Sequence, residues 1–497
     1  MSFLVERIAV DMDGWRRAFE SAAQDGARLG ALWGSDERDR AGGFAVHAVL
    51  VIHDRLVCLH LPVEGTEFPD VSHFFPSAAR MQRAIADLLG LRAGTDPRGW
   101  LRHGAWSANA APLRRDLPYD ARPPEDDARY AFVPVEGEGV HEIAVGPVHA
   151  GIIEPGHFRF SVVGERVLRL EERLGYVHKG IEKRFEMMTL QEAAALAGRV
   201  CGDSTVAFAW AYAMALESAT GATLPMRALW LRALLLERER IANHLGDLGY
   251  LGNDGGLAFG LAQFSRLKEN VLRTNARLFG HRYAMDRVVP GGVAVDLDRS
   301  GAGELVAEGE RLDAEVQALR SIYYDHAGLQ DRCINAGRLA PDIAGRLGVV
   351  GLAARASGHA MDARVYPGFA PYEVLQPKLC AHRNGDVASR IVVRFEELFE
   401  SLALQRRILD SLPSGDCRIA LTPPADGAFG IGWVEGWRGE VFVALEAGPG
   451  GRVRRCHPHD PSWQNWPALE YAVLGNIVPD FPLINKSFNL SYAGADL

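Results

Sequence analysis

The chain has 497 residues, of which 48% are hydrophobic and 24% charged, and a formal net charge of −9 at pH 7. This mixture is typical of soluble globular proteins, and the length predicts two or more domains. The acidic balance, without any block of Lys and Arg, argues against nucleic acid as a partner. The six cysteines lie far apart and form no CxxC pair, which favours a reducing compartment over a disulfide framework.

We expect neither a secretory signal nor a membrane span. The first residues, "MSFLVERIAVDMDGW", have no cationic start before an apolar core. The longest apolar run, at 206–216, has eleven residues, whereas a bilayer needs about 20. The chain is therefore expected not to cross a membrane itself, while docking onto a membrane protein stays open.

The first part of the chain predicts a small α+β unit. Residues 44–63 are rich in Val, Leu and Ile around a central His-Asp pair, which predicts a β-hairpin or two successive strands. A helix is expected at 77–91, where Ser77 can cap the first turn and apolar residues recur at helical spacing. Prolines and acidic residues at 117–129 are typical of a linker. We expect domains at 1–125 and 140–497, joined by a linker at 126–139.

The second part predicts a mainly helical domain with small sheets. Short strands at about 140–173 precede a helix from about residue 174 or a little later, and helical patterns fill 186–285 with breaks near 221–225 and 252–256. Further helices are expected at 302–325, 341–356 and 386–410, and a small sheet near the end. In the middle helix, Glu237, Arg238 and Arg240 are expected to lie away from the apolar face. The expected fold class is α+β.

Two stretches carry candidate catalytic residues. "GPVHAGIIEPGHFRF" places His149, Glu154 and His157 among glycines, in a turn where side chains can point into a cleft. "RVCGDS" holds Cys201 and Ser204 at the spacing of a metal-binding cysteine pair, with serine in the second place. The structural alternatives are turn histidines that only form local hydrogen bonds and a buried thiol that packs as a small apolar group.

Two further stretches carry paired charges. "YVHKGIEKRFE" places His178 and Glu182 four residues apart, which predicts an ordinary pair on a helix surface. "VEGWRGE" places Arg438 between two carboxylates, among glycines that permit close approach. The structural alternative for Arg438 is a salt bridge within a hairpin.

Taken together, these stretches resemble a known family. Residues 140–497 resemble the large subunit of group 4 nickel-iron hydrogenases and the 49 kDa subunit of respiratory complex I. The resemblance rests on "GPVHAGIIEPGHFRF", "LGYVHKGIEK", "RVCG", "EGWRGE" and "NWPALEYAVLGNIVPDFP". Residues 1–125 resemble the 30 kDa subunit of complex I, through "FPDVSHFFPSAARMQRAIADLLGL" and "APLRRD". The resemblance implies a hydrogenase large-subunit-like fold for the second domain.

The resemblance also shows which ligands are missing. Hydrogenases of this family bind nickel and iron through two CxxC pairs, and the matching positions here are Cys201, Ser204, Ser491 and Gly494. Soft thiolates suit these metals, whereas a serine hydroxyl stays protonated and glycine offers no donor. A single thiolate cannot hold the two metals, so no metal is expected in this chain. Arg438 matches the arginine above the hydrogenase metal site.

What fills the retained cavity stays open at this point, and the resemblance to complex I makes a quinone-like or other organic acceptor one candidate. His149 matches the histidine that holds the quinone headgroup, while the tyrosine partner is replaced by Ala195 or Leu196. Glu154 and His157 match a hydrogenase loop on the proton path. We therefore expect His149, Glu154, His157 and Arg438 to be catalytic, and His149, Cys201 and Arg438 to contact the ligand.

These resemblances imply a peripheral subunit of a membrane-bound oxidoreductase of the NADH- or ferredoxin-quinone type, on the cytoplasmic face of the cytoplasmic membrane. The expected partners are a small iron-sulfur subunit like the 20 kDa subunit of complex I, a ferredoxin-like subunit and antiporter-like membrane subunits. One alternative is a redox-silent structural subunit that couples its partners. A second alternative is an active [NiFe]-hydrogenase of the formate hydrogenlyase type, against which the ligand count argues.

Overall fold

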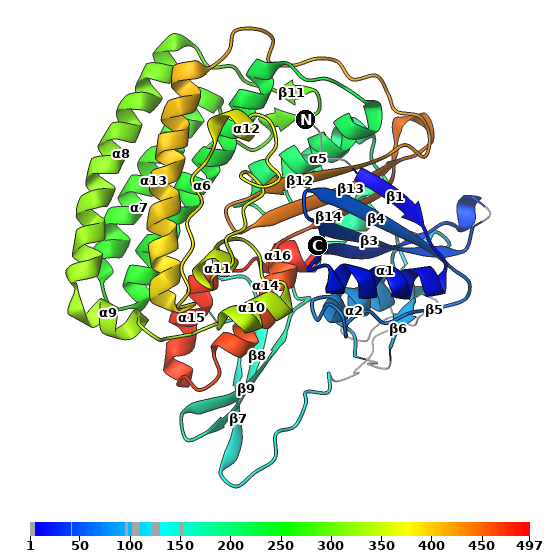
Figure 1. The fold of residues 1–497 in the computed structure, drawn as a ribbon, viewed down its shortest axis with the longest axis horizontal. Coiled ribbons are helices and arrows are strands. Elements are labelled where there is room, and N and C mark those ends of the chain that lie inside the picture. The colour runs from blue at the N-terminus through cyan, green and yellow to red at the C-terminus, as the bar shows by residue number, and fades with distance from the viewer. Residues whose placement is uncertain (1–4, 41, 95–97, 102–109, 122–129, 150–152) are drawn as a thin grey trace.

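The computed structural model describes residues 5–40, 42–94, 98–101, 110–121, 130–149 and 153–497 (Figure 1). An N-terminal mixed sheet with two helices lies beside a body of long helices, and several smaller sheets are placed around that body. The predicted α+β class is therefore confirmed. Within the described ranges, no helix combines the length and the apolar character that a membrane span requires.

The N-terminal sheet has the strand order β1-β4-β3-β2, with β1 parallel to β4 and the other pairs antiparallel. Its strands are β1 (Val5–Ala9), β2 (Arg28–Asp36), β3 (Phe44–Ile52) and β4 (Arg55–Val63), and its helices are α1 (Met12–Gln24) and α2 (Ala78–Leu89). Two short strands, β5 (Glu67–Phe68) and β6 (Arg92–Ala93), pair beside α2. The hairpin predicted at 44–63 is confirmed. The helix predicted at 77–91 is also present, but Ser77 forms no side-chain capping bond.

The described part of the predicted linker contacts both the N-terminal unit and the segment that follows the linker. Its residues 126–129 lie outside the described ranges. Tyr130 accepts a hydrogen bond from Arg83 of α2 at 3.0 Å and donates one to Glu171 at 3.1 Å. The backbone N–H of Val133 also donates to Glu171, at 2.9 Å. One hydrophobic core runs across the predicted boundary, from α2 to the C-terminal helices, and the domain division stays a prediction.

An antiparallel three-stranded sheet projects from the body (Figure 1). It consists of β7 (Val140–Val145), β8 (His157–Val163) and β9 (Arg166–Arg173), and α3 (Ile181–Phe185) follows it. The helix expected from about residue 174 or a little later begins at Ile181. His178 precedes α3 and bonds to the Asp496 carbonyl, while Glu182 is buried. The predicted surface pair of His178 and Glu182 is wrong, because the C-terminal segment and strand β14 (Val453–His459) cover this helix.

The body is built around α6, which packs against α5, α7, α13 and α15 (Figure 1). The long helices are α5 (Thr205–Thr220), α6 (Met226–Asp254), α7 (Ala258–Phe279), α8 (Arg299–Asp325) and α13 (Val387–Ser411). The shorter ones are α4 (Leu190–Ala197), α9 (Ala327–Cys333), α10 (Pro341–Leu347), α11 (Gly351–Ala356), α12 (Tyr372–Leu375), α14 (Ser462–Ala472), α15 (Phe481–Phe488) and α16 (Tyr492–Asp496). Both predicted helix breaks are present, the first at 221–225 and the second at 255–257, which is three residues later than the predicted start.

The charged residues of α6 point into the protein. Glu237, Arg238 and Arg240 are each at most 1% exposed. They were expected only to lie away from the apolar face, and their burial was not predicted, because the pattern of one helix does not show that neighbouring elements cover α6 all round. Each instead pairs with buried groups from distant parts of the chain, as Arg238 does with Glu308 at 2.7 Å.

The predicted terminal sheet consists of β12 (Phe429–Glu435), β13 (Glu440–Ala447) and β14 (Val453–His459). A two-stranded ribbon, β10 (Val288–Val289) and β11 (Gly292–Val293), lies nearby. Helix α5 lies directly on β12, and a Cβ atom at Gly430 or Gly432 would overlap its backbone. Only glycine permits this close approach.

Strand β2 joins the N-terminal sheet to the terminal sheet. Arg28 forms a two-point ion pair with Glu440, at 2.7 and 2.8 Å. Arg455 of β14 donates two hydrogen bonds to the Gly34 carbonyl, at 3.0 and 2.9 Å. These bonds fix the N-terminal unit against the helical body.

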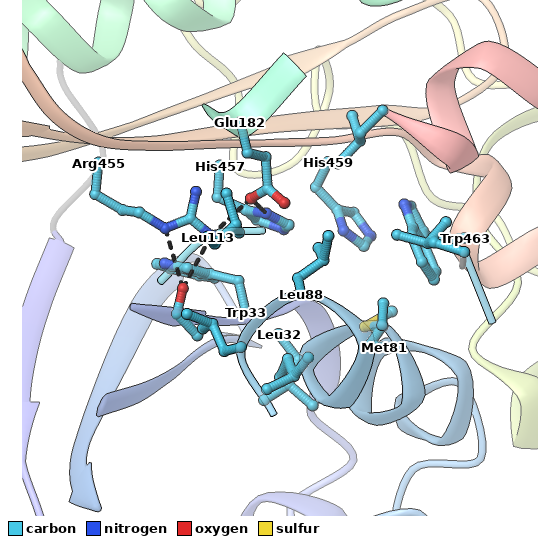
Figure 2. A pocket seen from close by; sticks show the side chains of 16 residues that line it. Leu32, Trp33, Met81, Leu88, Leu113, Glu182, Arg455, His457, His459 and Trp463 are labelled. Carbon is cyan, nitrogen blue, oxygen red and sulfur yellow. Dashed lines mark hydrogen bonds and ion pairs between the residues drawn. The ribbon is translucent and has the colours of Figure 1, made fainter. Parts of the chain in front are cut away.

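Imidazole rings lie at this junction, around a small cavity of about 20 Å³ (Figure 2). Trp33 is stacked between His47 and His457, with ring centroids 5.1 Å apart on both sides. Glu182 accepts a hydrogen bond from His457 at 2.8 Å. His459 faces Gln464 at 3.0 Å, and because the Gln464 amide donates to two backbone carbonyls, its oxygen accepts from the His459 ring.

We expect this junction to weaken in acid. Burial lowers the pKa of His459 to about 3, and the neighbouring His457 lowers it further in the same direction. Since an unfolded histidine titrates near pH 6.5, the unfolded chain binds more protons below that pH. This group should therefore cost the folded state about 2 kcal/mol between pH 6.5 and pH 5. Urea unfolding at both pH values should show less acid sensitivity in His459→Gln, and equal sensitivity would contradict the expectation.

Candidate functional site

A pocket of about 920 Å³ opens between α6, α7 and the C-terminal segment. The segment before β8, the α4–α5 loop, the β12–β13 turn and the chain after α15 complete its wall. Four of the predicted site residues line it: His149, Glu154, Cys201 and Arg438. The fifth, His157, does not line it.

The β12–β13 turn holds Arg438 at the floor of this pocket. Its guanidinium forms a two-point ion pair with Asp203, with both distances 2.6 Å. It also donates to Ser204 Oγ at 3.2 Å and to the Asn489 carbonyl at 2.5 Å, and it lies 4.0 Å from the centre of the Trp437 ring. A bidentate arginine-carboxylate pair of this kind fixes both side chains. The pair therefore closes the floor of the pocket with a fixed cation.

Cys201 is held in the thiol form. Its sulfur lies 3.0 Å from Asp203 Oδ1 and 3.1 Å from Ser491 Oγ. Burial raises the pKa of this thiol well above its usual value, and the Asp203 charge raises it further. Burial opposes ionisation of Asp203 as well, but the Arg438 charge outweighs it and lowers the pKa of Asp203 to about 2. At neutral pH the floor thus carries a carboxylate, a guanidinium and a neutral thiol.

The four positions that match metal ligands lie together, but they do not form a metal-binding set. Ser491 Oγ caps α16 by accepting the Gly494 N–H at 2.8 Å. A Cβ atom at Gly494 would overlap the Asp460 carboxylate. Among the described residues, no group of three or more His, Cys, Asp or Glu side chains is arranged to hold a metal ion. One neutral thiol and two hydroxyls do not fit a nickel-iron centre.

His149 lies in the wall with one ring nitrogen free. Its Nδ1 lies 3.3 Å from the Pro147 carbonyl, and its ring meets Phe158 edge-on at 5.7 Å. Nε2 is buried and has no hydrogen-bond partner in the described part of the chain. Because a carbonyl only accepts, Nδ1 carries the hydrogen and Nε2 keeps its lone pair in the neutral ring. The described residues therefore leave the Nε2 lone pair unused, and a turn of the ring would be needed to bring this buried atom to a ligand in the pocket.

The other two predicted residues differ in position. Glu154 is exposed, and it accepts a hydrogen bond from the Ala493 N–H at 2.9 Å. His157 begins β8, where its ring faces the Gly146 carbonyl at 3.3 Å and accepts from Arg159 at 3.4 Å. Burial lowers the pKa of His157. These contacts give His157 a local structural role and no place in the pocket.

The pocket also contains charged residues that sequence analysis missed. Lys486 lies 4.7 Å from the centre of the Tyr250 ring and 3.3 Å from Asn489 Oδ1, and burial lowers its pKa. Asn489 in turn donates to Asp247 at 2.7 Å. Asp203 could have been found from the sequence, because it is a charged residue between Cys201 and Ser204 in "RVCGDS". For Lys486, the C-terminal motif "NKSFN" offered no spacing that predicts a site.

Family comparisons place this chain among subunits related to those of respiratory complex I. The family model described as "Respiratory-chain NADH dehydrogenase, 49 Kd subunit" matches residues 254–426, and the model of the 30 Kd subunit matches residues 8–123. The chain thus joins two units related to complex I, as the sequence predicted.

Individual relatives identify the family. Formate hydrogenlyase subunit 5 of Escherichia coli (strain K12) is 33% identical over 95% of this chain and 85% of its own length. Hydrogenase-4 component G of the same organism is 31% identical over 99% of this chain and 86% of its own length. The chain belongs to this family of group 4 hydrogenase and complex I subunits, and it is a subunit of an oxidoreductase complex.

A solved structure confirms the fold. A chain in the structure of the membrane-bound sulfane sulfur reductase, an archaeal respiratory membrane complex, matches with a TM-score of 0.69 at 24% identity. The match covers 73% of this chain and all of the other. At this identity the likeness establishes a shared fold.

Proposed function

We propose that this chain is a peripheral subunit of a membrane-bound complex I-like oxidoreductase, and that its pocket receives a quinone-like organic acceptor without a nickel-iron centre. The observation that carries this proposal is the Arg438–Asp203 ion pair beside the neutral Cys201 thiol. It places a fixed cation and hydrogen-bond donors on the floor of a 920 Å³ pocket, where the family's metal ligands would lie.

The pocket residues suit the reduction of a carbonyl-bearing acceptor. A quinone takes up two electrons and two protons to become a hydroquinone. Arg438 and the Cys201 thiol stabilise negative charge that develops on the nearer oxygen. His149, once its ring turns toward the pocket and is protonated at Nε2, donates to the other oxygen and can pass on that proton. Glu154 is exposed and lines the same pocket, so it can bring the second proton from solvent.

The electrons come from a partner in this proposal. We propose a small iron-sulfur subunit at the rim of the pocket, a ferredoxin-like subunit, and antiporter-like membrane subunits below them. The relatives support this arrangement, because they are named as components of hydrogenase and membrane-bound respiratory complexes. The proposed location is the cytoplasmic face of the cytoplasmic membrane.

Metal analysis of the purified complex tests the absence of a nickel-iron centre. The complex should contain iron from its iron-sulfur partner and no stoichiometric nickel, because the four ligand positions supply one protonated thiol. Nickel at one atom per chain would contradict the proposal and restore the hydrogenase alternative.

Acceptor reduction by the complex tests the role of the pocket. His149→Gln should lower the rate with an added quinone roughly 100-fold or more, because the proton donor is lost. His141→Gln is the matched control, since His141 is an exposed residue of β7 in the same sheet as His157. The same assay should include polysulfide as a second electron acceptor, because one structure with the same fold is named as a sulfane sulfur reductase. Unchanged turnover in His149→Gln, with intact assembly, would favour a redox-silent subunit.

A further inference from the structure

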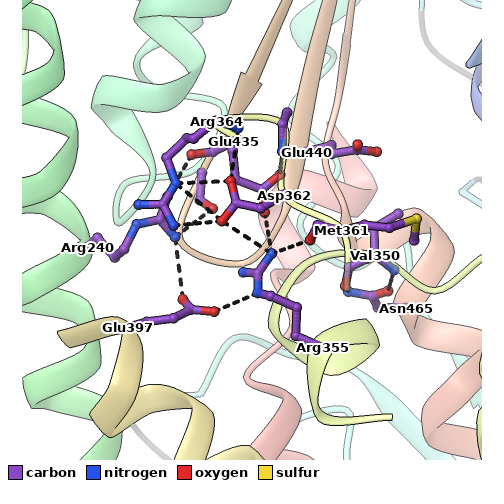
Figure 3. Close-up of polar contacts among 12 residues, drawn as sticks. Arg240, Val350, Arg355, Met361, Asp362, Arg364, Glu397, Glu435, Glu440 and Asn465 are labelled. Carbon is purple, nitrogen blue, oxygen red and sulfur yellow. Dashed lines mark hydrogen bonds and ion pairs between the residues drawn. The ribbon is translucent and has the colours of Figure 1, made fainter. Parts of the chain in front are cut away.

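A sealed cluster of charges lies behind the β12–β13 turn (Figure 3). Its cations are Arg240, Arg355 and Arg364, and its carboxylates are Glu237, Asp362, Glu397 and Glu435. All seven residues are at most 4% exposed. The proposed acceptor chemistry uses none of them.

Arg355 connects two of the carboxylates. Its guanidinium donates to Glu397 at 2.7 Å and to Glu435 at 2.9 Å, and it lies 3.7 Å from Asp362. Glu435 also accepts the Ala363 N–H at 3.2 Å. Glu435 is thus held by one guanidinium that it shares with two other carboxylates.

The other two arginines are committed elsewhere. Arg364 forms ion pairs with Asp362 at 2.6 Å and with Glu237 at 3.0 Å. Glu237 accepts two further bonds, from Tyr372 and Ser401, both at 2.6 Å. Arg240 lies 3.6 Å from both Glu237 and Glu397, and its shortest bonds go to backbone carbonyls.

The cluster therefore contains one carboxylate more than it has guanidinium groups. The neighbouring groups do not supply the missing charge. His244 donates to Glu397, but burial lowers its pKa and keeps the ring neutral. The Arg28–Glu440 pair on the other side of Glu435 is balanced in itself. A net charge left in a sealed interior costs several kcal/mol, and a bound proton removes it.

We propose that Glu435 holds this balancing proton, so that the cluster is a proton-binding site directly behind the wall of the acceptor pocket. Burial raises the pKa of Glu435 to about 7, and the Asp362 charge raises it too, while Arg355 acts in the opposite direction. Asp362 keeps its charge, because Arg364 lowers its pKa against the effect of burial.

The site is connected to the pocket through the turn itself. Arg240 donates to the carbonyls of Glu435 and Gly436, at 2.8 and 3.1 Å. Arg438 follows two residues later and forms the pocket floor. Near pH 7 a site with a pKa of about 7 is only about half protonated, so negative charge on a reduced acceptor would raise the proton affinity of Glu435 and complete its protonation from solvent. This coupling rests on the proposed function, whereas the proton site does not.

Infrared difference spectroscopy on the full chain, titrated from about pH 5 to about pH 9, tests the proton site without any acceptor or partner. The wild type should lose a protonated-carboxyl band with a midpoint near 7, and Glu435→Gln should lack that component. The comparison with the variant is needed because Glu239 and Asp496 also have raised pKa values, about 8 and about 7. Identical spectra for the variant and the wild type would overturn the proposal.

A second variant tests the site if Glu435→Gln does not fold. The Glu440 charge raises the pKa of Glu435, so Glu440→Gln should keep the band and move its midpoint to lower pH. A midpoint that stays in place would count against Glu435 as the proton carrier. Because neither experiment involves electron transfer, failure here is distinct from failure of the proposed acceptor function.

Discussion

Replacing Arg438 by glutamine is expected to abolish acceptor reduction in the assembled complex. The substitution removes the fixed cation of the pocket floor and leaves Asp203 without its two-point partner. A third of the Asp203 side chain faces the pocket, so solvent offsets part of the loss. We expect stability to fall by about 2 kcal/mol, measured as the urea unfolding midpoint beside the rate of quinone reduction.

Two variants separate the charge from the stability effect. Arg438→Gln combined with Asp203→Asn leaves no unpaired charge, so it should recover most of the stability and none of the activity. Arg438→Lys keeps the positive charge but not the forked geometry, and it should retain part of the activity. Full activity in Arg438→Gln would remove this residue from the proposed mechanism.

Replacing Arg355 by methionine should lower the free energy of unfolding by about 3–5 kcal/mol, which is more than we expect for Arg438→Gln. Arg355 is fully buried and is bonded to both Glu397 and Glu435. Its removal leaves the Glu397 carboxylate in an interior where water cannot solvate it. Methionine fills much of the volume, so the effect reports the charge more than a cavity. Chemical unfolding at neutral pH measures the loss.

A surface ion pair provides the control for this substitution. Arg266 pairs with Glu315, and both side chains are nearly half exposed. Arg266→Met should leave the unfolding midpoint unchanged, because exposed pairs contribute little. A loss in Arg355→Met as small as the loss in this control would contradict the importance of the buried cluster.

Sequence patterns predicted the elements whose side chains follow a simple period. The hairpin of β3 and β4, the helix α2 and the breaks around α6 were predictable because apolar spacing and turn residues determine them locally. The burial of Glu237 and Arg240 was not predictable in this way. Periodicity assigns charged residues to solvent, and their partners Arg364 and Glu397 lie more than 120 residues away along the chain.

The candidate site shows the same division. Four residues that motif resemblance singled out, namely His149, Glu154, Cys201 and Arg438, line one pocket, and their catalytic or ligand-binding role stays a prediction. Motif resemblance also included His157, whose ring turns toward the Gly146 carbonyl instead. Asp203, whose carboxylate pairs with Arg438 in the pocket floor, lies in the stretch "RVCGDS", but no sequence pattern predicted its role.

The contact of α5 with β12 bears on how the pocket can respond to different molecules. Backbone lies against backbone there, with only glycine between the two elements. The loop that carries Cys201 and the turn that carries Arg438 are attached to these two elements. If α5 and β12 slid past one another, their main-chain atoms would collide. The Cys201 thiol and the Arg438 guanidinium are therefore expected to keep a fixed distance from each other. Near Cys201 and Arg438 the pocket should therefore select bound molecules by their shape. Any structural adjustment to a different molecule should occur in the opposite wall of the pocket.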